Sequence, residues 1–367
     1  MTVENIRLQG FRNYSETGAE FSGEVNVIAG KNAQGKTNLM EALYYLSTGR
    51  SFRARSDRDL VGFDREAAEL YAEVLTHGRK TTLEAKIIKG RRKEFFSGGA
   101  RLKTAAELSG KLAAVLFCPD DLGMIRDGAA VRRRLVNQCL AQLRPRYAAA
   151  LSEFGRLYEH KTRILRDWRE KPSLLDTLDD FSRQLSEASA VLIHYRAQMA
   201  LRLSEKAALI HREFSGGVEK LGISYKTIGA IENPLAKPSE LLPYILEHQR
   251  ARRQAEIDSG SCLVGAHKDD LEITIDGAAA RSFASQGQSR TAALSIKLAE
   301  RDIMYDDIGE YPVLLLDDVL SELDGQRQNF VLNRIRGGQV FITCCEDEGI
   351  AGKTGGRILK IDGGVIS

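Results

Sequence analysis

A glycine-rich segment near the N-terminus contains the first residues whose types and spacing could do chemistry. It matches the pattern Gly-x-x-x-x-Gly-Lys-Thr in full, and its residues are Gly30, Lys31, Asn32, Ala33, Gln34, Gly35, Lys36 and Thr37. An apolar strand pattern precedes it and a helical pattern follows, so its backbone N–H groups and the helix N-terminus would face phosphates. We therefore predict that Lys36 contacts the β- and γ-phosphates of a nucleotide and that the Thr37 hydroxyl binds Mg²⁺. A glycine-rich turn without a ligand is the alternative.

Two adjacent carboxylates near the C-terminus supply the second part of such a site. Asp317 and Asp318 directly follow the apolar run 313–316, which indicates a buried strand. We predict that Asp317 completes the Mg²⁺ shell and that Asp318 orients and deprotonates an attacking water. Taken alone, the pair could also be solvated acids at the end of a strand. The phosphate loop favours the catalytic interpretation.

A third segment, Ser-Gln-Gly-Gln at 285–288, precedes another helical pattern. Its hydroxyl and backbone N–H groups would again lie at a helix N-terminus and form a second phosphate-facing site. Because the chain already has one phosphate loop, we predict that Ser285, Gly287 and Gln288 complete the nucleotide site of another copy. The segment could instead be a simple N-cap turn. Its position before the acidic pair, and the Ser-Glu-Leu-Asp run at 321–324, favour the nucleotide interpretation.

The separation of 281 positions between Lys36 and Asp317 indicates how the chain is organised. A small kinase or GTPase would not leave such a gap, so two nucleotide-binding parts must close around an insertion with neighbouring exit and entry points. We expect an α/β fold in three parts. Residues 1–127 and 256–367 would form the N- and C-terminal parts of one ATPase head, and residues 128–255 an inserted helical domain.

Apolar residues at spacings of three and four predict two long helices in the insertion. The first ends near Trp168, and the second begins after Pro172 and carries a heptad seam that continues, past one skip, to Phe214. Two such helices joined by a short proline turn should fold back as an antiparallel, coiled-coil-like hairpin. An ordinary helical subdomain core is the alternative.

The remaining patterns place the motifs on strands and helices. We predict a helix from Lys36 to about Leu46, and strands at residues 6–8, 24–29, 68–75, 81–88, 271–275, 313–316 and 340–343. The strands at 68–75 and 81–88 alternate apolar and polar residues and should pair as an antiparallel hairpin.

Composition excludes several classes of protein. With 43% apolar and 28% charged residues in a chain of 367, the sequence is typical of a globular protein and not of a disordered or collagen-like one. It has no basic stretch leading into an apolar run and no apolar run of membrane-spanning length, so we expect a cytoplasmic protein. The five cysteines lack CxxC spacing and His267 has no second ligand at metal spacing, so we expect no metal cluster.

The net charge is only +3, so any affinity for nucleic acid must come from local clusters of Lys and Arg. Such clusters occur at residues 50–58, 89–93, 132–134 and 250–253. Each could be a solvated face. Any that line DNA would contact phosphates, and affinity would then fall steeply with salt. The sequence has no recognition helix or base-reading motif, which favours binding by shape over binding by sequence.

The whole chain resembles the RecF family, bacterial recombination-mediator ATPases related to the SMC heads and more distantly to the ABC transporter ATPases. The resemblance rests on Phe-Arg-Asn-Tyr at 11–14, Gln-Gly-Lys-Thr-Asn at 34–38, the run 117–122, the arginines at 132 and 133, the run 264–270, the Ser285 signature and the run 316–324. It implies an ABC/SMC-type ATPase head in which Arg12, Asn13 and Asn38 also bind the nucleotide.

Departures from the family pattern are mild. Ala266 and Lys268 stand where the family usually has Pro and Arg, and Asn137 stands where an Asp is common. Like its family, the chain has no histidine after the strand at 340–343, where transporter ATPases carry one that contacts the γ-phosphate. Thr343 or its neighbours could take that place.

The resemblance implies an ATP-dependent homodimer that binds single- and double-stranded DNA and favours their junctions. Its partners would be RecR and RecO, with which it would load RecA at gaps during repair and replication. One rival function is the ATP-hydrolysing subunit of a membrane transporter, but transporter heads hold their motifs closer in sequence and need no heptad hairpin. A scaffold that binds ATP without turnover is another rival, and Asp318 argues against it.

Overall fold

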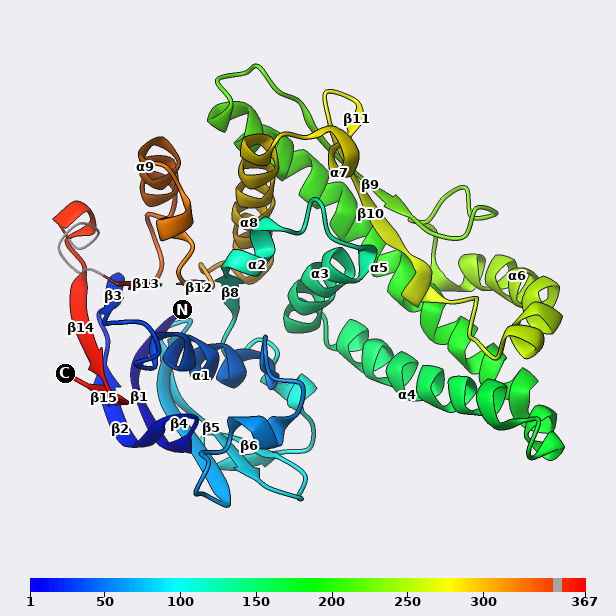
Figure 1. The fold of residues 1–367 in the computed structure, drawn as a ribbon, viewed down its shortest axis with the longest axis horizontal. Coiled ribbons are helices and arrows are strands. Elements are labelled where there is room, and N and C mark those ends of the chain that lie inside the picture. Colours follow the sequence, from blue (N-terminus) through cyan, green and yellow to red (C-terminus); the bar gives the residue numbers. More distant parts are fainter. Residues whose placement is uncertain (346–351) are drawn as a thin grey trace. The chain divides into compact units, whose positions relative to one another are not determined.

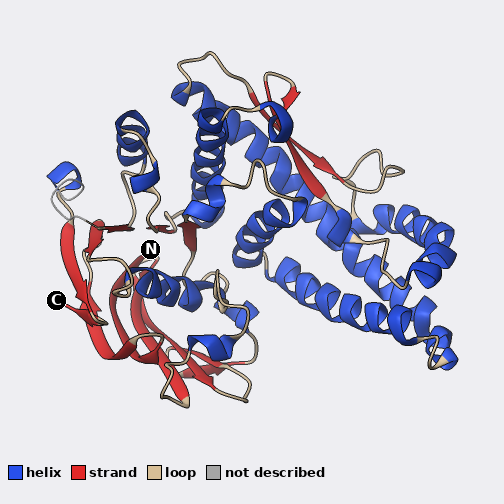
Figure 2. Cartoon of the chain, in the orientation of Figure 1, coloured by secondary structure: helices blue, strands red, loops and turns tan. Residues whose placement is uncertain are grey.

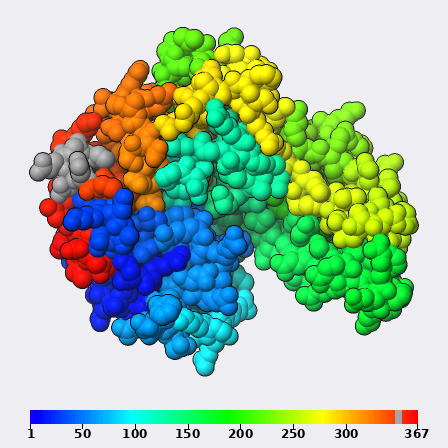
Figure 3. All heavy atoms as spheres, viewed as in Figure 1, coloured from blue at the N-terminus to red at the C-terminus, as the bar shows by residue number. Residues whose placement is uncertain are grey.

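Two sheets and one helix build the part of the chain that carries the phosphate loop (Figures 1 and 2). The computed structural model describes residues 1–345 and 352–367, which divide into two compact units. The first unit holds residues 1–122 and 297–367, and the second holds residues 123–296. The first and last parts of the chain therefore fold together, and Figure 3 shows their residues packed against one another.

A six-stranded sheet forms the centre of the first unit. Its strands are, in spatial order, β15 (Val365–Ile366), β14 (Arg357–Asp362), β3 (Val25–Ala29), β13 (Val340–Cys344), β12 (Val313–Leu316) and β8 (Ala114–Phe117). All neighbours pair in parallel except β14 and β15. β8, β12 and β13 are fully buried runs that are almost wholly apolar, as expected for parallel strands. The residues that follow β3 and β12 therefore emerge at the same edge of the sheet.

A second six-stranded sheet is antiparallel. Its strands are, in spatial order, β2 (Tyr14–Glu20), β1 (Thr2–Phe11), β4 (Ala67–Thr76), β5 (Arg79–Ile88), β6 (Glu94–Ser97) and β7 (Ala100–Leu102). The predicted hairpin of β4 and β5 is confirmed, with Thr76 opposite Arg79 at its turn. Helix α1 (Lys36–Thr48) packs on strands of both sheets and buries Leu39, Met40 and Leu43 between them.

The first unit also contains several shorter helices. They are η1 (Asp57–Leu60), η2 (Ala105–Leu108), α2 (Pro119–Leu122), η5 (Leu320–Glu322) and α9 (Gly325–Arg334). Helix α8 (Gln286–Ile308) begins in the second unit and carries the chain back into the first.

The second unit is mainly helical. Its elements are α3 (Ala129–Leu143), α4 (Pro145–Asp167), η3 (Pro172–Thr177), α5 (Leu178–Phe214), β9 (Leu221–Lys226), α6 (Pro238–Ser259), η4 (Ala266–Lys268), β10 (Asp270–Ile275), β11 (Ala278–Ala279) and α7 (Ala280–Phe283). The predicted helical hairpin is confirmed: α4 and α5 lie side by side and are joined through η3 (Figure 1). Seam residues Leu185, Leu192 and Leu203 of α5 are buried. Among the helices that the structure describes, none combines the length and the hydropathy needed to cross a bilayer.

The unit boundaries differ from the expected domain boundaries at both ends of the inserted domain, and at the first end residues 123–127 lie in the second unit. Residues 256–296, which the sequence patterns assign to the C-terminal part of the head, lie in the second unit. The reason is strand pairing, because β10 pairs antiparallel with β9 over six residues, from Asp270 opposite Lys226 to Ile275 opposite Leu221. The sequence of a strand predicts that it is a strand but does not predict which other strand it pairs with.

Candidate nucleotide site

The phosphate loop connects β3 to α1 at the edge of the parallel sheet. Gly35 has φ +125°, in the region that disfavours side chains, and a Cβ there would lie 3.0 Å from both Asn13 Nδ2 and Tyr14 Oη. The Tyr14 hydroxyl donates to the Gly35 carbonyl at 2.9 Å, and Asn13 Nδ2 donates to the Gln34 carbonyl at 2.8 Å. The turn that opens α1 is thus held from outside by the segment between β1 and β2.

Lys36 points into this loop and is almost fully buried. Its ammonium donates to the carbonyl oxygens of Gly30 at 2.5 Å and Lys31 at 3.1 Å. Only 7% of the residue is exposed, so its long side chain is fixed against the loop backbone. A cation held inside a ring of loop backbone is placed as an anion-binding group requires.

Thr37 and Asp317 meet at the sheet edge although they lie 280 residues apart. The Thr37 hydroxyl donates to Asp317 Oδ1 at 3.1 Å, and the Thr343 hydroxyl donates to the same oxygen at 3.1 Å. Burial raises the pKa of Asp317, and the two threonine hydrogen bonds oppose that shift. The structure therefore brings together the two residues that the sequence assigns to Mg²⁺.

The donor set fits a magnesium ion. Thr37 and Asp317 supply one hydroxyl and one carboxylate, which are hard oxygen ligands, and Mg²⁺ typically takes few protein ligands and completes its shell with water and phosphate. The part of the chain that the structure describes contains no group of three or more His, Cys, Asp or Glu side chains placed to hold a metal. The two ligands Thr37 and Asp317 therefore suit an ion whose remaining ligands are the phosphates of a nucleotide and water.

Asp318 is held in an unusual backbone conformation. Its φ of +54° lies in the left-handed region, which costs a residue with a side chain about 1–2 kcal/mol. Two side chains hold it there: the Asp318 N–H donates to the Thr343 hydroxyl at 2.7 Å, and the Ser321 hydroxyl donates to the Asp318 carbonyl at 2.7 Å. The Ser321 hydroxyl also contacts Asp318 Oδ1 at 3.1 Å. The carboxylate is therefore aimed by its neighbours.

Thr343 is a site residue whose role the sequence patterns did not predict. The sequence suggests Thr343 only as a replacement for an absent histidine. In the structure its buried hydroxyl donates to Asp317 Oδ1 and accepts from the Asp318 N–H. The available signal was its place at the end of an apolar strand, next to the strand that ends in the acids. Strand adjacency is set by tertiary pairing, which the local pattern does not reveal.

Arg12, Asn13 and Asn38 gather beside the loop. Asn38 Nδ2 donates to Asn13 Oδ1 at 2.6 Å, and Arg12 makes two 2.8 Å hydrogen bonds to the Glu41 carboxylate on α1. Burial would raise the pKa of Glu41, but hydrogen bonds from Arg12, Arg53 and Ser51 outweigh it and lower the pKa. The three residues predicted to bind the nucleotide therefore lie together beside the start of α1. Their contact with the nucleotide stays a prediction.

The Ser285 segment belongs to the second unit. Gln288 N donates to the Ser285 hydroxyl at 3.1 Å, and Ser285 N donates to Gln288 Oε1 at 2.8 Å. This reciprocal pair is a capping box at the start of α8. Ser285 is nevertheless exposed, and Gln288 also donates to Glu219 at 3.0 Å. The cap anchors the segment and leaves the Ser285 side of the turn open to solvent.

Comparison with known proteins identifies the family. The model of the RecF/RecN/SMC N-terminal domain family matches residues 2–357. The DNA replication and repair protein RecF of Listeria monocytogenes serotype 4b is 39% identical over 360 residues, which cover 96% of this chain and 95% of that protein. This chain belongs to the RecF family. The RecF of Shouchella clausii is 35% identical over 353 residues, covering 95% of this chain and 94% of that protein.

Solved structures agree with the RecF assignment. The structure of the recombination mediator protein RecF-ATPrS in the RecFOR pathway has a TM-score of 0.92 and 32% identity, covering all of this chain and 97% of that chain. That of RecF-ATP has a TM-score of 0.91 and 31% identity, with 100% and 96% covered. A Pyrococcus furiosus Smc head domain, at 17% identity and TM-score 0.54, shares the fold. The predicted RecF resemblance and the ABC/SMC-type head with an inserted helical hairpin are both confirmed.

Proposed function

We propose that this chain is an ATP-dependent switch of DNA repair. It would bind ATP with Mg²⁺, dimerise around the nucleotide, hydrolyse it slowly, and hold DNA where single and double strands meet. RecR and RecO would be its partners in loading recombinase at gaps. The observation that carries this proposal is the Thr37–Asp317–Thr343 contact, because it joins the phosphate loop to the acid pair in one site. Relatives named as DNA replication and repair proteins, and neighbours named RecF-ATP, support it.

Each site residue has one task in the proposed mechanism. The loop backbone and Lys36 would bind the β- and γ-phosphates, while Thr37 and Asp317 would hold Mg²⁺. Bound Mg²⁺ would supply charge neutralisation at the transferred phosphoryl group. Asp318 would accept the proton of the attacking water, and the hydrogen bonds to its backbone fix the direction of the carboxylate.

Turnover should be slow. Related ATPases often carry Glu where this chain has Asp318, and the shorter side chain draws the carboxylate back by about 1 Å. A misplacement of about 1 Å in a reacting group can cost on the order of 100-fold in rate. Slow hydrolysis suits a switch, because the nucleotide-bound state must last long enough to be used.

The site is completed by a second copy in this proposal. Ser285 of one protomer would contact the γ-phosphate held by its partner, so that each dimer contains two composite sites. Exposure of Ser285 and its position at the N-terminus of a 23-residue helix support this role. ATP would then be required for dimerisation, because the γ-phosphate is the group that the two protomers share.

Nucleotide dependence is the test of this function. We expect light scattering to report mainly monomer with ADP and dimer with ATP or a non-hydrolysable analogue, because only a γ-phosphate can bridge the protomers. Gapped DNA should bind the ATP form and increase phosphate release. A protein that is dimeric without nucleotide, or that binds DNA equally with ADP, would contradict the proposal. An ATP-bound dimer that releases no phosphate would identify a scaffold.

Thr343 provides a test of the acid pair. Thr343→Val keeps the shape of the side chain but removes the hydroxyl that Asp317 and the Asp318 N–H share. Leaving buried polar groups unpaired costs about 1–3 kcal/mol, so we expect roughly 10- to 100-fold slower hydrolysis and weaker Mg²⁺ dependence of ATP binding. Thr343→Ser should restore most of both. Equal hydrolysis by Thr343→Val and wild type would show that the hydroxyl does not position the acids.

A further inference from the structure

Positive charge is concentrated in three short segments of the first unit. Residues 49–58, 89–93 and 101–103 together contain ten Lys or Arg side chains and one carboxylate, Asp57. The whole chain has a net charge of only +3, so the residues outside these segments carry a net charge of −6. We call the three segments the basic edge. A field this uneven attracts a polyanion to one place and repels it elsewhere.

Specific contacts hold the basic edge together in space. The Lys93 ammonium donates to the Gly49 carbonyl at 2.8 Å and pairs with Asp57 at 2.9 Å, which ties the first segment to the second. Arg92 Nη2 lies 3.5 Å from the Lys103 carbonyl, which brings in the third. In Figure 1 the label β6 marks this part of the first unit. Three segments distant in sequence therefore form one surface.

Some cations of the basic edge are used internally and others are not. Arg53 pairs with Glu41, Arg101 with Glu94, and Lys93 with Asp57. By contrast, Arg50, Arg55, Arg91 and Lys103 are exposed, and none has a carboxylate partner within the described residues. Like charges gathered without partners raise the free energy of the unbound protein, and phosphates would relieve that repulsion.

An exposed aromatic ring lies next to these cations. Phe63 is 97% exposed, the highest value among the large hydrophobic residues described, and its carbonyl accepts from the Lys89 ammonium at 3.4 Å. A ring this exposed contributes almost nothing to the core. Beside a line of phosphate-binding cations, it offers a platform on which an unpaired base can stack.

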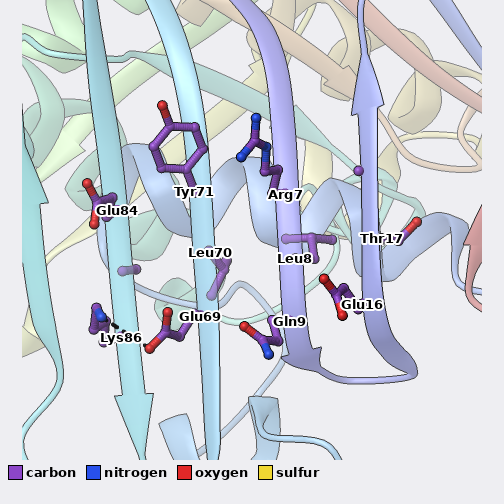
Figure 4. Close-up of a pocket in the computed structure, with 12 residues that line it drawn as sticks. Arg7, Leu8, Gln9, Glu16, Thr17, Glu69, Leu70, Tyr71, Glu84 and Lys86 are labelled. Atoms are coloured by element: carbon purple, nitrogen blue, oxygen red, sulfur yellow. Dashed lines mark ion pairs between the residues drawn. The ribbon is translucent and has the colours of Figure 1, made fainter.

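The neighbouring hollow on the same sheet has a different character. It encloses about 590 Å³ and is lined from β1, β2, β4 and β5 (Figure 4). Arg7 and Lys86 face it, but so do the carboxylates Glu16, Glu69 and Glu84, and Lys86 already pairs with Glu69 at 3.1 Å. Mixed charge of this kind would repel part of a polyanion, so the hollow is not the place where phosphates bind.

We infer that the basic edge binds the sugar–phosphate backbone of DNA and that Phe63 stacks on an unpaired base of the adjoining single strand. This inference rests on the proposed function and gives it a location. The exposed cations hold the backbone of either strand form without reading sequence. Phe63 can engage only a base that is not paired, so it distinguishes a junction from a continuous duplex.

A charge variant with a matched control tests whether the basic edge binds the DNA backbone. Arg91→Gln/Arg92→Gln/Lys103→Gln should bind gapped DNA on the order of 100-fold more weakly than wild type at about 0.1 M salt, and the slope of log affinity against log salt should fall by about two to three. Lys171→Gln/Arg250→Gln/Arg252→Gln removes the same charge from exposed residues of the second unit and should bind like wild type. ATP binding should be unchanged in both.

Any other pattern of DNA binding by the two triple variants would contradict the assignment of DNA binding to the basic edge. If the control triple loses DNA binding and the test triple keeps it, the 250–253 cluster is the DNA surface instead. Should the test triple fail to fold, as judged by its thermal unfolding midpoint, the pair Arg50→Gln/Arg55→Gln makes the same comparison. A wild-type protein that binds no DNA with ATP would refute the proposed function itself, whereas wild-type binding with an unaffected test variant refutes only this inference.

Substitutions of Phe63 test whether its ring stacks on an unpaired base. Phe63→Ala should bind gapped DNA roughly 5- to 100-fold more weakly, the range expected for losing one stacked base, and should bind a blunt duplex as wild type does. Phe63→Tyr retains a ring and should bind both substrates normally. Equal losses on gapped and blunt DNA would show that Phe63 does not read the unpaired base.

Discussion

Replacing Lys36 with alanine should abolish ATP binding at cellular concentrations while leaving the fold intact. The ammonium lies inside the phosphate loop. It would donate two charged hydrogen bonds to a bound nucleotide, one to the β-phosphate and one to the γ-phosphate. Hydrogen bonds to charged groups contribute about 1.5–3 kcal/mol each, so we expect affinity to fall roughly 10²- to 10⁴-fold. Equilibrium titration with a fluorescent ATP analogue measures this directly.

The adjacent lysine provides a matched control for that experiment. Lys31 lies in the same loop, is exposed, and contributes only its carbonyl to the contacts with Lys36. Lys31→Ala should therefore bind ATP within a few-fold of wild type. If Lys36→Ala and Lys31→Ala bound ATP equally well, the loop would not be a phosphate-binding loop.

Ser285→Arg should give a protein that binds ATP but does not dimerise. On the proposed function, Ser285 contacts the partner's γ-phosphate, where a small hydroxyl and close backbone approach are needed and a long cation would prevent closure. ATP-induced dimerisation, hydrolysis and ATP-dependent DNA binding should all be lost, while the monomer keeps its affinity for nucleotide. Sedimentation with and without ATP measures the first effect.

Two controls separate the steric effect from loss of the helix cap. Ser285→Ala removes the capping hydroxyl, which should cost about 0.5–2 kcal/mol of stability, and should still dimerise at least partly. Ser239→Arg puts the same cation on an exposed position of α6 and should behave as wild type. Dimerisation of Ser285→Arg with ATP at the wild-type level would rule out the role of Ser285 in the partner's site.

Mixing two inactive variants makes the test stricter. In a dimer of Ser285→Arg with Lys36→Ala, one of the two sites pairs an intact phosphate loop with an intact Ser285 segment. That site should recover part of the hydrolysis that each variant lacks alone. No recovery at any mixing ratio would contradict a composite site or show that both sites must act together.

The sequence was most informative where chemistry or packing imposes a local pattern. The phosphate loop, the apolar runs of β3, β12 and β13 and the heptad seam of α5 were predicted, because each has a period or spacing that one segment must satisfy alone. The parallel strands β8 and β14 were not predicted. The contact of Thr343 with the acid pair and the contact of Glu41 with Arg12 were not predicted, because tertiary structure brings the partners together. Thr343 lies 26 residues from Asp317, and Glu41 lies 29 residues from Arg12. Residues 256–296 were assigned to the C-terminal part of the head because the pairing of β10 with β9, which places them in the second unit, is also set by tertiary structure.

The position of β3 in the parallel sheet has a consequence for how the protein folds during synthesis. Both neighbours of β3, which are β13 and β14, lie at the far end of the chain. About 310 residues separate the end of β3 from the start of β13, so at roughly 5–20 residues per second both edges of β3 stay unpaired for about 15–60 s. During that time an apolar strand next to the phosphate loop is exposed to other nascent chains, and unpaired strand edges promote aggregation. The yield of folded protein on overexpression should therefore depend strongly on chaperone supply and on the last residues of the chain. The stability of the protein once it has folded should depend on them far less.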